Sequence, residues 1–184
     1  MELEYTEEPC KESSDFDIEK FKQFLQYVIH KTSSISNVGK TVLYKILYFT
    51  DFNYYELFEE KLSGETYLKY PYGPAPCDFD EVIDELKTKG LIKETLTNYT
   101  IYPQNKFTST TEPDTSKFTK EELEFIDKSI DDYSSFNATE ISEHSHKDTP
   151  YIVAEDFEEL DYELVFYRGP ELSVRVYDGE DDSD

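Results

Sequence analysis

Three consecutive residues, Gly39, Lys40 and Thr41, match the end of the phosphate-binding loop G-x-x-x-x-G-K-[ST]. The first glycine of that loop lets backbone amides wrap the phosphates, but Ser34 stands at its position here. The loop should also follow a buried strand, whereas the apolar residues between positions 18 and 29 recur at helical spacing. We therefore predict that the three residues begin a helix and bind no nucleotide.

A second group combines residue types that bind metal ions: Glu140, Glu143, His144 and His146. Residues two apart on a helix point to different sides, so His144 and His146 cannot share an ion unless the helix ends between them. The group also lacks the H-E-x-x-H pattern of zinc enzymes. The sequence therefore predicts no metal site.

No residue has the setting of an activated nucleophile. The sequence contains no G-x-S-x-G elbow, and Cys77 with a distant histidine is too weak a pattern to indicate an enzyme. Cys10 and Cys77 form no C-x-x-C motif, and two such cysteines give no framework for zinc or for a disulfide-stapled domain. We expect a protein that is not an enzyme and that needs neither a cofactor nor a small-molecule substrate.

The charge of the chain is strongly negative and unevenly distributed. The 184 residues carry a net charge of −24, and residues 155–184 contain 12 acidic but only 2 basic residues. The phosphate backbone of nucleic acid repels such a molecule, whereas a basic protein partner is attracted and steered toward it. Taken alone, solubility is an equally good explanation of the acidity.

Composition also restricts the class of protein. Aromatic residues make up 16% of the chain, which is enough to build a hydrophobic core. No stretch approaches the ~20 apolar residues of a membrane span, and the acidic N-terminus lacks the apolar core of a signal peptide. We therefore expect a cytoplasmic protein that does not bind membranes.

The hydrophobic periodicity predicts an α+β fold that is mostly helical, with about five to six helices around a central apolar helix and a small antiparallel β-sheet. Helices are expected over residues 15–31, 36–58, 78–90, 119–133, 137–147 and 154–167. Strands are expected over residues 66–70 and 91–102 and at the alternating Leu172, Val174 and Val176. The domain is expected to span residues 15–177, between a flexible lead-in (1–14) and an acidic, disordered tail (178–184).

Several stretches resemble the signatures of one family. KILYFTDFNYY, residues 45–55, resembles the KLLYFADFLHY helix of the Panacea domain, the antitoxin domain of many prokaryotic and phage toxin–antitoxin pairs. SGETYLKYPYGPAP, residues 63–76, resembles its second signature, in which a glycine and an extended aromatic run precede Y-G-P. EISEHSHKDTPY has the family's histidine and proline, with Tyr151 where tryptophan is common. The resemblance covers residues 16–167.

The resemblance implies a protein that neutralises a co-encoded toxin by binding it directly, and one branch of the family also hands its toxin to a protease. It implies no catalytic residues. Lys40 and Lys45 are then polar positions of the core helix, not phosphate ligands. The residues that match the family's motifs, and for which a structural role is expected, are Lys45, Leu47, Tyr48, Phe49, Gly64, Tyr72, Gly73, Pro74, Gly90, His146 and Pro150.

Two groups of residues are candidates for binding the toxin. Tyrosines on a proline-stiffened loop bind at a low entropic cost, although their rings would equally well cover the central helix. An acidic run farther on would contact a basic surface of the toxin, or it is simply a solvated face. The candidates are Tyr67, Tyr70, Tyr72, Glu155, Asp156, Glu158 and Glu159.

The alternative hypothesis is a winged-helix-like, DNA-binding transcriptional regulator. A helix that ends at Gly90 and leads into a hairpin is how such domains complete their recognition segment. Four lysines lie nearby: Lys87, Lys89, Lys93 and Lys106. The candidate helix itself carries four acidic residues where phosphate contacts need basic ones: Asp80, Glu81, Asp84 and Glu85. We therefore expect no direct binding of nucleic acid.

Overall fold

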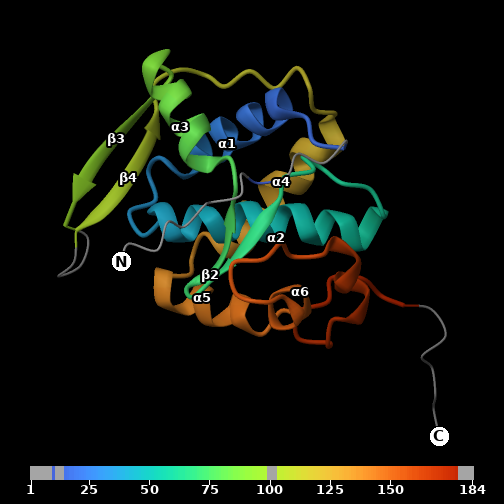
Figure 1. Ribbon diagram of the computed structural model, residues 1–184. Helices are drawn as coiled ribbons and strands as arrows, with labels where there is room; N and C mark the ends of the chain where they lie inside the picture. Colours follow the sequence, from blue (N-terminus) through green and yellow to red (C-terminus); the bar gives the residue numbers. More distant parts are fainter. Residues whose placement is uncertain (1–9, 11–14, 99–102, 178–184) are drawn as a thin grey trace, which may run out of the picture.

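The computed structural model describes residue 10 and residues 15–98 and 103–177, and it shows an α+β fold that is mostly helical (Figure 1). The predicted fold class is therefore confirmed. The elements in chain order are α1 (Ile18–Thr32), α2 (Lys40–Phe58), β1 (Tyr67–Tyr70), β2 (Gly73–Pro76), α3 (Phe79–Thr88), β3 (Ile92–Thr97), β4 (Gln104–Ser109), α4 (Lys120–Tyr133), α5 (Ala138–His146), α6 (Thr149–Val153) and the 3-10 helix η1 (Tyr162–Tyr167).

The helix α2 lies at the centre of the molecule, with α1 and α3 on one side and α5 and α6 on the other (Figure 1). Twelve of its 19 residues are buried. Leu47, Tyr48 and Phe49 are each at most 1% exposed, so neighbouring positions around the helix all face the core. A helix that is apolar on more than one face must be enclosed in this way, and the predicted central helix is confirmed.

The chain enters α2 through Gly39, and Lys40 is the first helical residue. The preceding element is α1, so the predicted position of the G-K-T sequence between two helices is confirmed. A Cβ atom at Gly39 would lie 2.5 Å from the side chain of Gln104, which explains why a glycine suits this site. The Nζ atom of Lys40 lies 3.0 Å from a carboxylate oxygen of Asp80 in α3. These residues thus serve to hold elements together.

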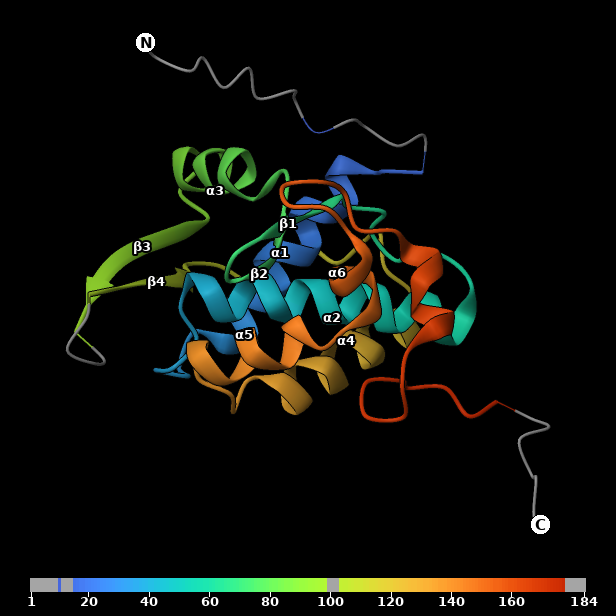
Figure 2. The same ribbon diagram turned by 60° about the horizontal axis from the view of Figure 1, so that its bottom comes forward.

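Two antiparallel hairpins complete the fold. The strand β1 pairs with β2, with Tyr67 opposite Pro76, and this hairpin lies against α2. The hairpin of β3 and β4 instead extends away from the body of the molecule (Figures 1 and 2). Gly73 opens β2 with φ of 115°, a conformation that residues with a side chain rarely adopt.

The helix predicted over residues 154–167 is wrong. The helix α6 ends at Val153, and η1 begins only at Tyr162. The backbone between them bonds along β1: Phe157 donates to the carbonyl of Lys69 at 2.8 Å, and Lys69 donates to that of Glu158 at 2.9 Å. The open edge of β1 offers unpaired N–H and C=O groups. Residues 157–160 bond to these groups and therefore do not form the helix that the spacing of their apolar residues predicts.

The strand predicted at Leu172, Val174 and Val176 is also wrong. Leu172 is 7% exposed, but Val176 is 90% exposed, so the alternation does not mark a buried face. The amide of Val174 donates to the carboxylate of Glu56 at 3.0 Å instead of to a neighbouring strand. This polar contact decides the local conformation.

A disulfide bond joins Cys10 and Cys77, whose Cα atoms lie 5.9 Å apart. The expectation that the two cysteines form no disulfide framework is therefore wrong. The two cysteines are 67 residues apart in the sequence, so no local motif predicts that they form a disulfide bond. Apart from Cys10, the predicted lead-in and the predicted tail lie outside the described residues.

Candidate functional site

The three candidate tyrosines have different environments. Tyr67 is 0% exposed, and its hydroxyl donates to the carboxylate of Asp51 inside the core. Tyr70 is 41% exposed and Tyr72 is 75% exposed. Tyr67 is therefore part of the core, and only the other two tyrosines are available to a partner.

The acidic candidates lie beside the tyrosine loop. Glu155, Asp156, Glu158 and Glu159 are all exposed. Because the backbone of residues 157–160 bonds along β1, this run adjoins the strand that carries Tyr70. The rings of Tyr70 and Phe157 touch edge to face, with centroids 5.6 Å apart. The fold thus joins two candidate regions that are about 85 residues apart in the sequence.

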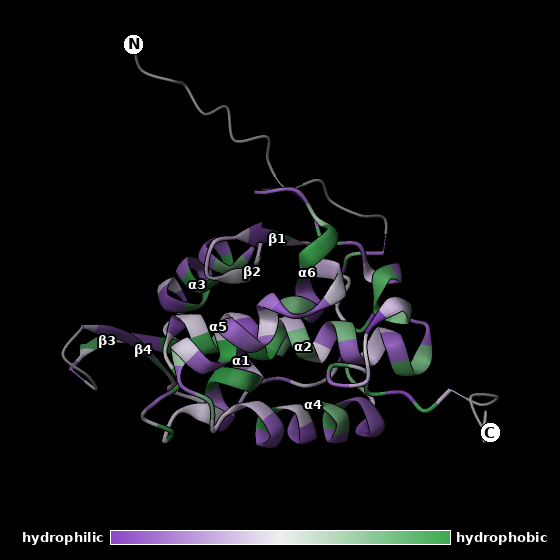
Figure 3. Ribbon diagram, turned by 90° about the horizontal axis from the view of Figure 1, so that it is seen from below, coloured by the Kyte–Doolittle hydropathy of each residue, from purple (hydrophilic) through white to green (hydrophobic). Residues whose placement is uncertain are grey.

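Exposed apolar side chains gather at this junction. Phe157 is 56% exposed, and Ile152 and Val153 at the end of α6 are 59% and 58% exposed. Figure 3 shows α6 as a mainly hydrophobic turn. The hydroxyl of Tyr151 in α6 donates to the carbonyl of Tyr70 at 2.5 Å, which links α6 to the tyrosine loop. We call the exposed set the apolar cluster; its members are Tyr70, Tyr72, Ile152, Val153 and Phe157.

A hollow of about 500 Å³ lies on the other side of the acidic run. Its walls include the carboxylates of Glu159, Asp161 and Glu163, the rings of Tyr55 and Tyr162, and Lys61, whose Nζ lies 5.0 Å from the centroid of the Tyr162 ring. The hydroxyl of Tyr55 donates to the carboxylate of Glu163. Glu159 therefore belongs to both the acidic run and the hollow, so the two features form a continuous surface.

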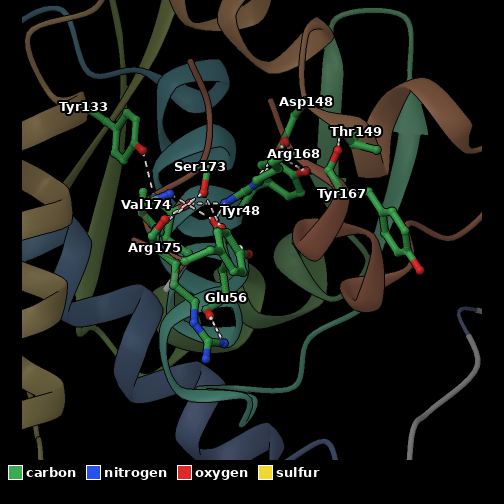
Figure 4. Close-up of polar contacts among 12 residues, drawn as sticks. Tyr48, Glu56, Tyr133, Asp148, Thr149, Tyr167, Arg168, Ser173, Val174 and Arg175 are labelled. Atoms are coloured by element: carbon green, nitrogen blue, oxygen red, sulfur yellow. Dashed lines mark hydrogen bonds and ion pairs between the residues drawn. The ribbon is translucent and has the colours of Figure 1, made fainter. Parts of the chain in front are cut away.

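A buried ionic network joins α2 to the end of η1 (Figure 4). Arg168 donates to both carboxylate oxygens of Asp148, at 2.8 and 2.7 Å, and to Glu56 at 3.0 Å. All three side chains are 0% exposed. Burial opposes the charge, but the two carboxylates raise the pKa of Arg168 above its usual value. The guanidinium therefore stays charged inside the protein.

The remaining oxygen atoms of this network also have partners. The hydroxyl of Tyr48 donates to Asp148 at 2.7 Å, and the hydroxyl of Ser173 donates to Glu56 at 2.5 Å. Tyr177 donates to the same carboxylate at 2.8 Å. Buried ion pairs are tolerated when their other hydrogen-bonding groups are satisfied, which is the case here. The network thus fixes the last described residues of the chain to α2.

A family model with the description "Antitoxin SocA-like, Panacea domain" matches residues 43–151, which is more than half of the chain. The chain belongs to this family. No curated protein and no solved structure matches it. The match confirms the resemblance inferred from the sequence motifs and suggests an antitoxin role, which implies a toxin as the partner. None of the described helices is long and apolar enough to span a membrane.

The first two Panacea signatures meet at Lys45. The prediction that Lys45 is a polar position of the helix is wrong, because it is 1% exposed and forms no ion pair with any residue that the structure describes. A Cβ atom at Gly73 would lie 2.5 Å from Cε of Lys45 and 2.5 Å from Oγ of Ser145. Burial lowers the pKa of Lys45 to about 7. The lysine of one signature therefore lies directly under the glycine of the other.

The third Panacea signature holds α5 against α6. The rings of His146 and Tyr151 stack with centroids 5.0 Å apart, and Pro150 is buried at the start of α6. His144 instead contacts the ring of Phe49, and burial lowers the pKa of His144. Within the described residues, no group of three His, Cys, Asp or Glu side chains is arranged to hold a metal ion.

The lysines of the DNA-binding alternative are mostly engaged within the Panacea domain. Lys106 is buried, and it donates to three backbone carbonyls near the end of α1 at 2.8 to 2.9 Å. Lys87 and Lys89 form ion pairs with nearby glutamates at 2.8 and 3.0 Å. Lys93 is exposed and has no ion pair with a described residue. Little positive charge is therefore left for phosphates on this side of the molecule.

Sequence reasoning missed Arg168 and the exposed pair Ile152 and Val153. Arg168 lies outside the matched signatures. The sequence feature that could have identified it is composition, because it is one of only two arginines in the chain and lies in the most acidic part. Arginine suits a buried, two-pronged bond to a carboxylate better than lysine does. The apolar pair has no such signal, because its exposure follows from the early end of α6.

Proposed function

We propose that this Panacea protein is an antitoxin that binds a protein toxin encoded next to it and neutralises the toxin by direct contact. Membership of the Panacea family supports the antitoxin role. The observation that carries the binding role is the junction of the apolar cluster with the acidic run. Neutralisation by binding needs no catalytic residue, cofactor or small-molecule substrate. The proposal includes a cytoplasmic location for the interaction, which the family's occurrence in prokaryotes and phages supports.

The fate of the bound toxin is a separate question. One branch of the family delivers its toxin to a protease, and simple blocking is the other candidate outcome. Both need the same complex, but blocking leaves the half-life of the toxin unchanged and delivery shortens it. A chase of the toxin level with and without this protein distinguishes the two.

Co-expression with the neighbouring toxin is expected to restore growth, and the two proteins are expected to purify together. The control is Leu47→Asp, because an ionised carboxylate at a 0% exposed site costs several kcal/mol and should unfold the domain. This variant should therefore give no protection. A folded wild-type protein that neither binds nor protects against its co-encoded neighbour would overturn the proposal.

The isolated chain is expected not to retard duplex DNA at physiological salt. The reason is the net charge of −24 together with lysines that are already paired within the protein. An electrophoretic mobility assay with the isolated chain checks this, since a toxin in the complex could bind DNA by itself. Tight, salt-sensitive binding that is lost in Lys87→Glu and Lys93→Glu would favour the winged-helix alternative.

A further inference from the structure

The stretch after α6 concentrates negative charge that the chain itself does not neutralise. Residues 155–163 carry six carboxylates in nine positions. All six are exposed, and none forms an ion pair with a residue that the structure describes. Elsewhere acidic residues often have partners; the half-buried Glu85, for example, pairs with both Lys22 and Lys89. We call these residues the acidic segment; they are Glu155, Asp156, Glu158, Glu159, Asp161 and Glu163.

The acidic segment is held in one conformation although it is neither a regular helix nor a regular strand. Its backbone bonds along β1, and Leu160 donates to the carbonyl of Tyr67 at 2.9 Å. Leu160 and Tyr162 are buried, at 1% and 6% exposed, and anchor it to the core. The side chain of Asp161 accepts the amide of Glu163 at the start of η1. A backbone that is already fixed lowers the entropic cost of binding a partner.

The apolar cluster adjoins the acidic segment through Phe157, which belongs to the same stretch of chain. An apolar centre with a charged, solvated margin is the usual anatomy of a protein interface, and aromatic residues supply most of the binding energy there. The hollow beside Glu159 already holds a cation of the chain itself, because Nζ of Lys61 lies 5.0 Å from the centroid of the Tyr162 ring. Carboxylates attract the cationic end of an arginine or lysine, and those of the acidic segment that lie beside Phe157 are the ones nearest to the apolar cluster.

We propose that the apolar cluster and the acidic segment together form the surface that docks the toxin, and that the occupant is a basic segment of the toxin with an apolar anchor. The anchor lies against Phe157 and Tyr70, and basic side chains pair with the acidic segment. Charge complementarity selects this occupant, because a second copy of the same chain would bring the same negative charge. This inference rests on the proposed function and adds the chemistry of the partner's contact region.

The electrostatic part is tested with a variant that neutralises four carboxylates: Glu155→Gln, Asp156→Asn, Glu158→Gln and Glu159→Gln. The control variant removes the same amount of charge from exposed positions of α4 and α5: Glu121→Gln, Glu124→Gln, Asp131→Asn and Glu143→Gln. Association with the purified toxin is followed by stopped flow at about 50 mM and about 500 mM NaCl. The first variant should associate about 10-fold more slowly at low salt and lose most of the salt dependence, whereas the control should change little.

The apolar part is tested with Phe157→Ala, and Leu96→Ala is the control because Leu96 is 70% exposed on the distant hairpin. Phe157→Ala should speed dissociation of the toxin about 10-fold or more, and Leu96→Ala should leave it unchanged. Thermal unfolding of each variant shows that the fold is retained. Wild-type rates in both surface variants, or equal slowing by the two charge variants, would overturn the docking inference while the wild-type protein still protects cells. Failure of the wild-type protein to bind its neighbour would instead overturn the proposed function.

Discussion

Arg168→Met is expected to lower the free energy of unfolding by about 3–5 kcal/mol. The substitution keeps much of the side-chain volume but leaves Asp148 and Glu56 as carboxylates at 0% exposed positions without their common cation. At about 2–4 °C per kcal/mol for a chain of this size, Tm should fall by roughly 6–20 °C. Thermal and urea unfolding followed by circular dichroism measure the change.

The control for this prediction is Arg175→Met. Arg175 lies 3.5 Å from Glu59, but the arginine side chain is 34% exposed and that of Glu59 is 65% exposed. An ion pair in contact with solvent contributes no more than about 1 kcal/mol, so this variant should stay close to the wild type. Equal stability of the two variants would show that the network contributes little.

Lys45→Met is expected to raise the free energy of unfolding, by up to about 5 kcal/mol below pH 7, because burial lowers the pKa of Lys45 from 10.5 to about 7 and each pKa unit corresponds to ~1.4 kcal/mol. Between pH 7 and 10.5 the unfolded chain holds a proton on this lysine that the folded chain lacks. The contribution of Lys45 to stability therefore improves as the pH rises through this range. The advantage of methionine should consequently be largest below pH 7 and vanish near pH 10.5.

Urea titrations of both proteins at a series of pH values measure this difference, and comparison with the wild type cancels the contributions of other titrating groups. Lys40→Met serves as the control, since Lys40 is partly exposed and paired with Asp80, which should make its change no more than about 1 kcal/mol. A Lys45→Met protein that is less stable than the wild type at every pH would show that the buried ammonium is well satisfied.

The elements that the sequence predicted correctly are those in which local pattern and burial agree. Apolar residues on several faces of residues 40–58 leave only the centre of the fold for α2. The capping pair Asn137 and Glu140 begins α5 with both reciprocal hydrogen bonds. Gly90 ends α3 with a positive φ of 73°. In each case, the signal lies within a few neighbouring residues.

The errors arise where distant residues decide the structure. The helical spacing between residues 154 and 167 is present, but the open edge of β1 competes for the same backbone groups and prevails. The burial of Lys45 depends on Gly73 and Ser145, which reach it only through the fold. The sequence predicts several members of the candidate surface, namely Tyr70, Tyr72 and the acidic run. It does not predict that they lie side by side, because their proximity follows from backbone pairing along β1 that no local pattern encodes.

The ties between α2 and residues 168–177 have a consequence for synthesis of the protein on the ribosome. Glu56 is translated early, yet its partners Arg168, Ser173, Val174 and Tyr177 all come more than 110 residues later. At a translation rate of ~5–20 residues per second, the ribosome makes these partners on the order of 6–25 s after Glu56. A nascent chain in that interval holds an unpaired glutamate in its most apolar helix and cannot complete its core. The newly made chain therefore completes its fold late, and a translational pause after α5 would lengthen the time that it spends incompletely folded.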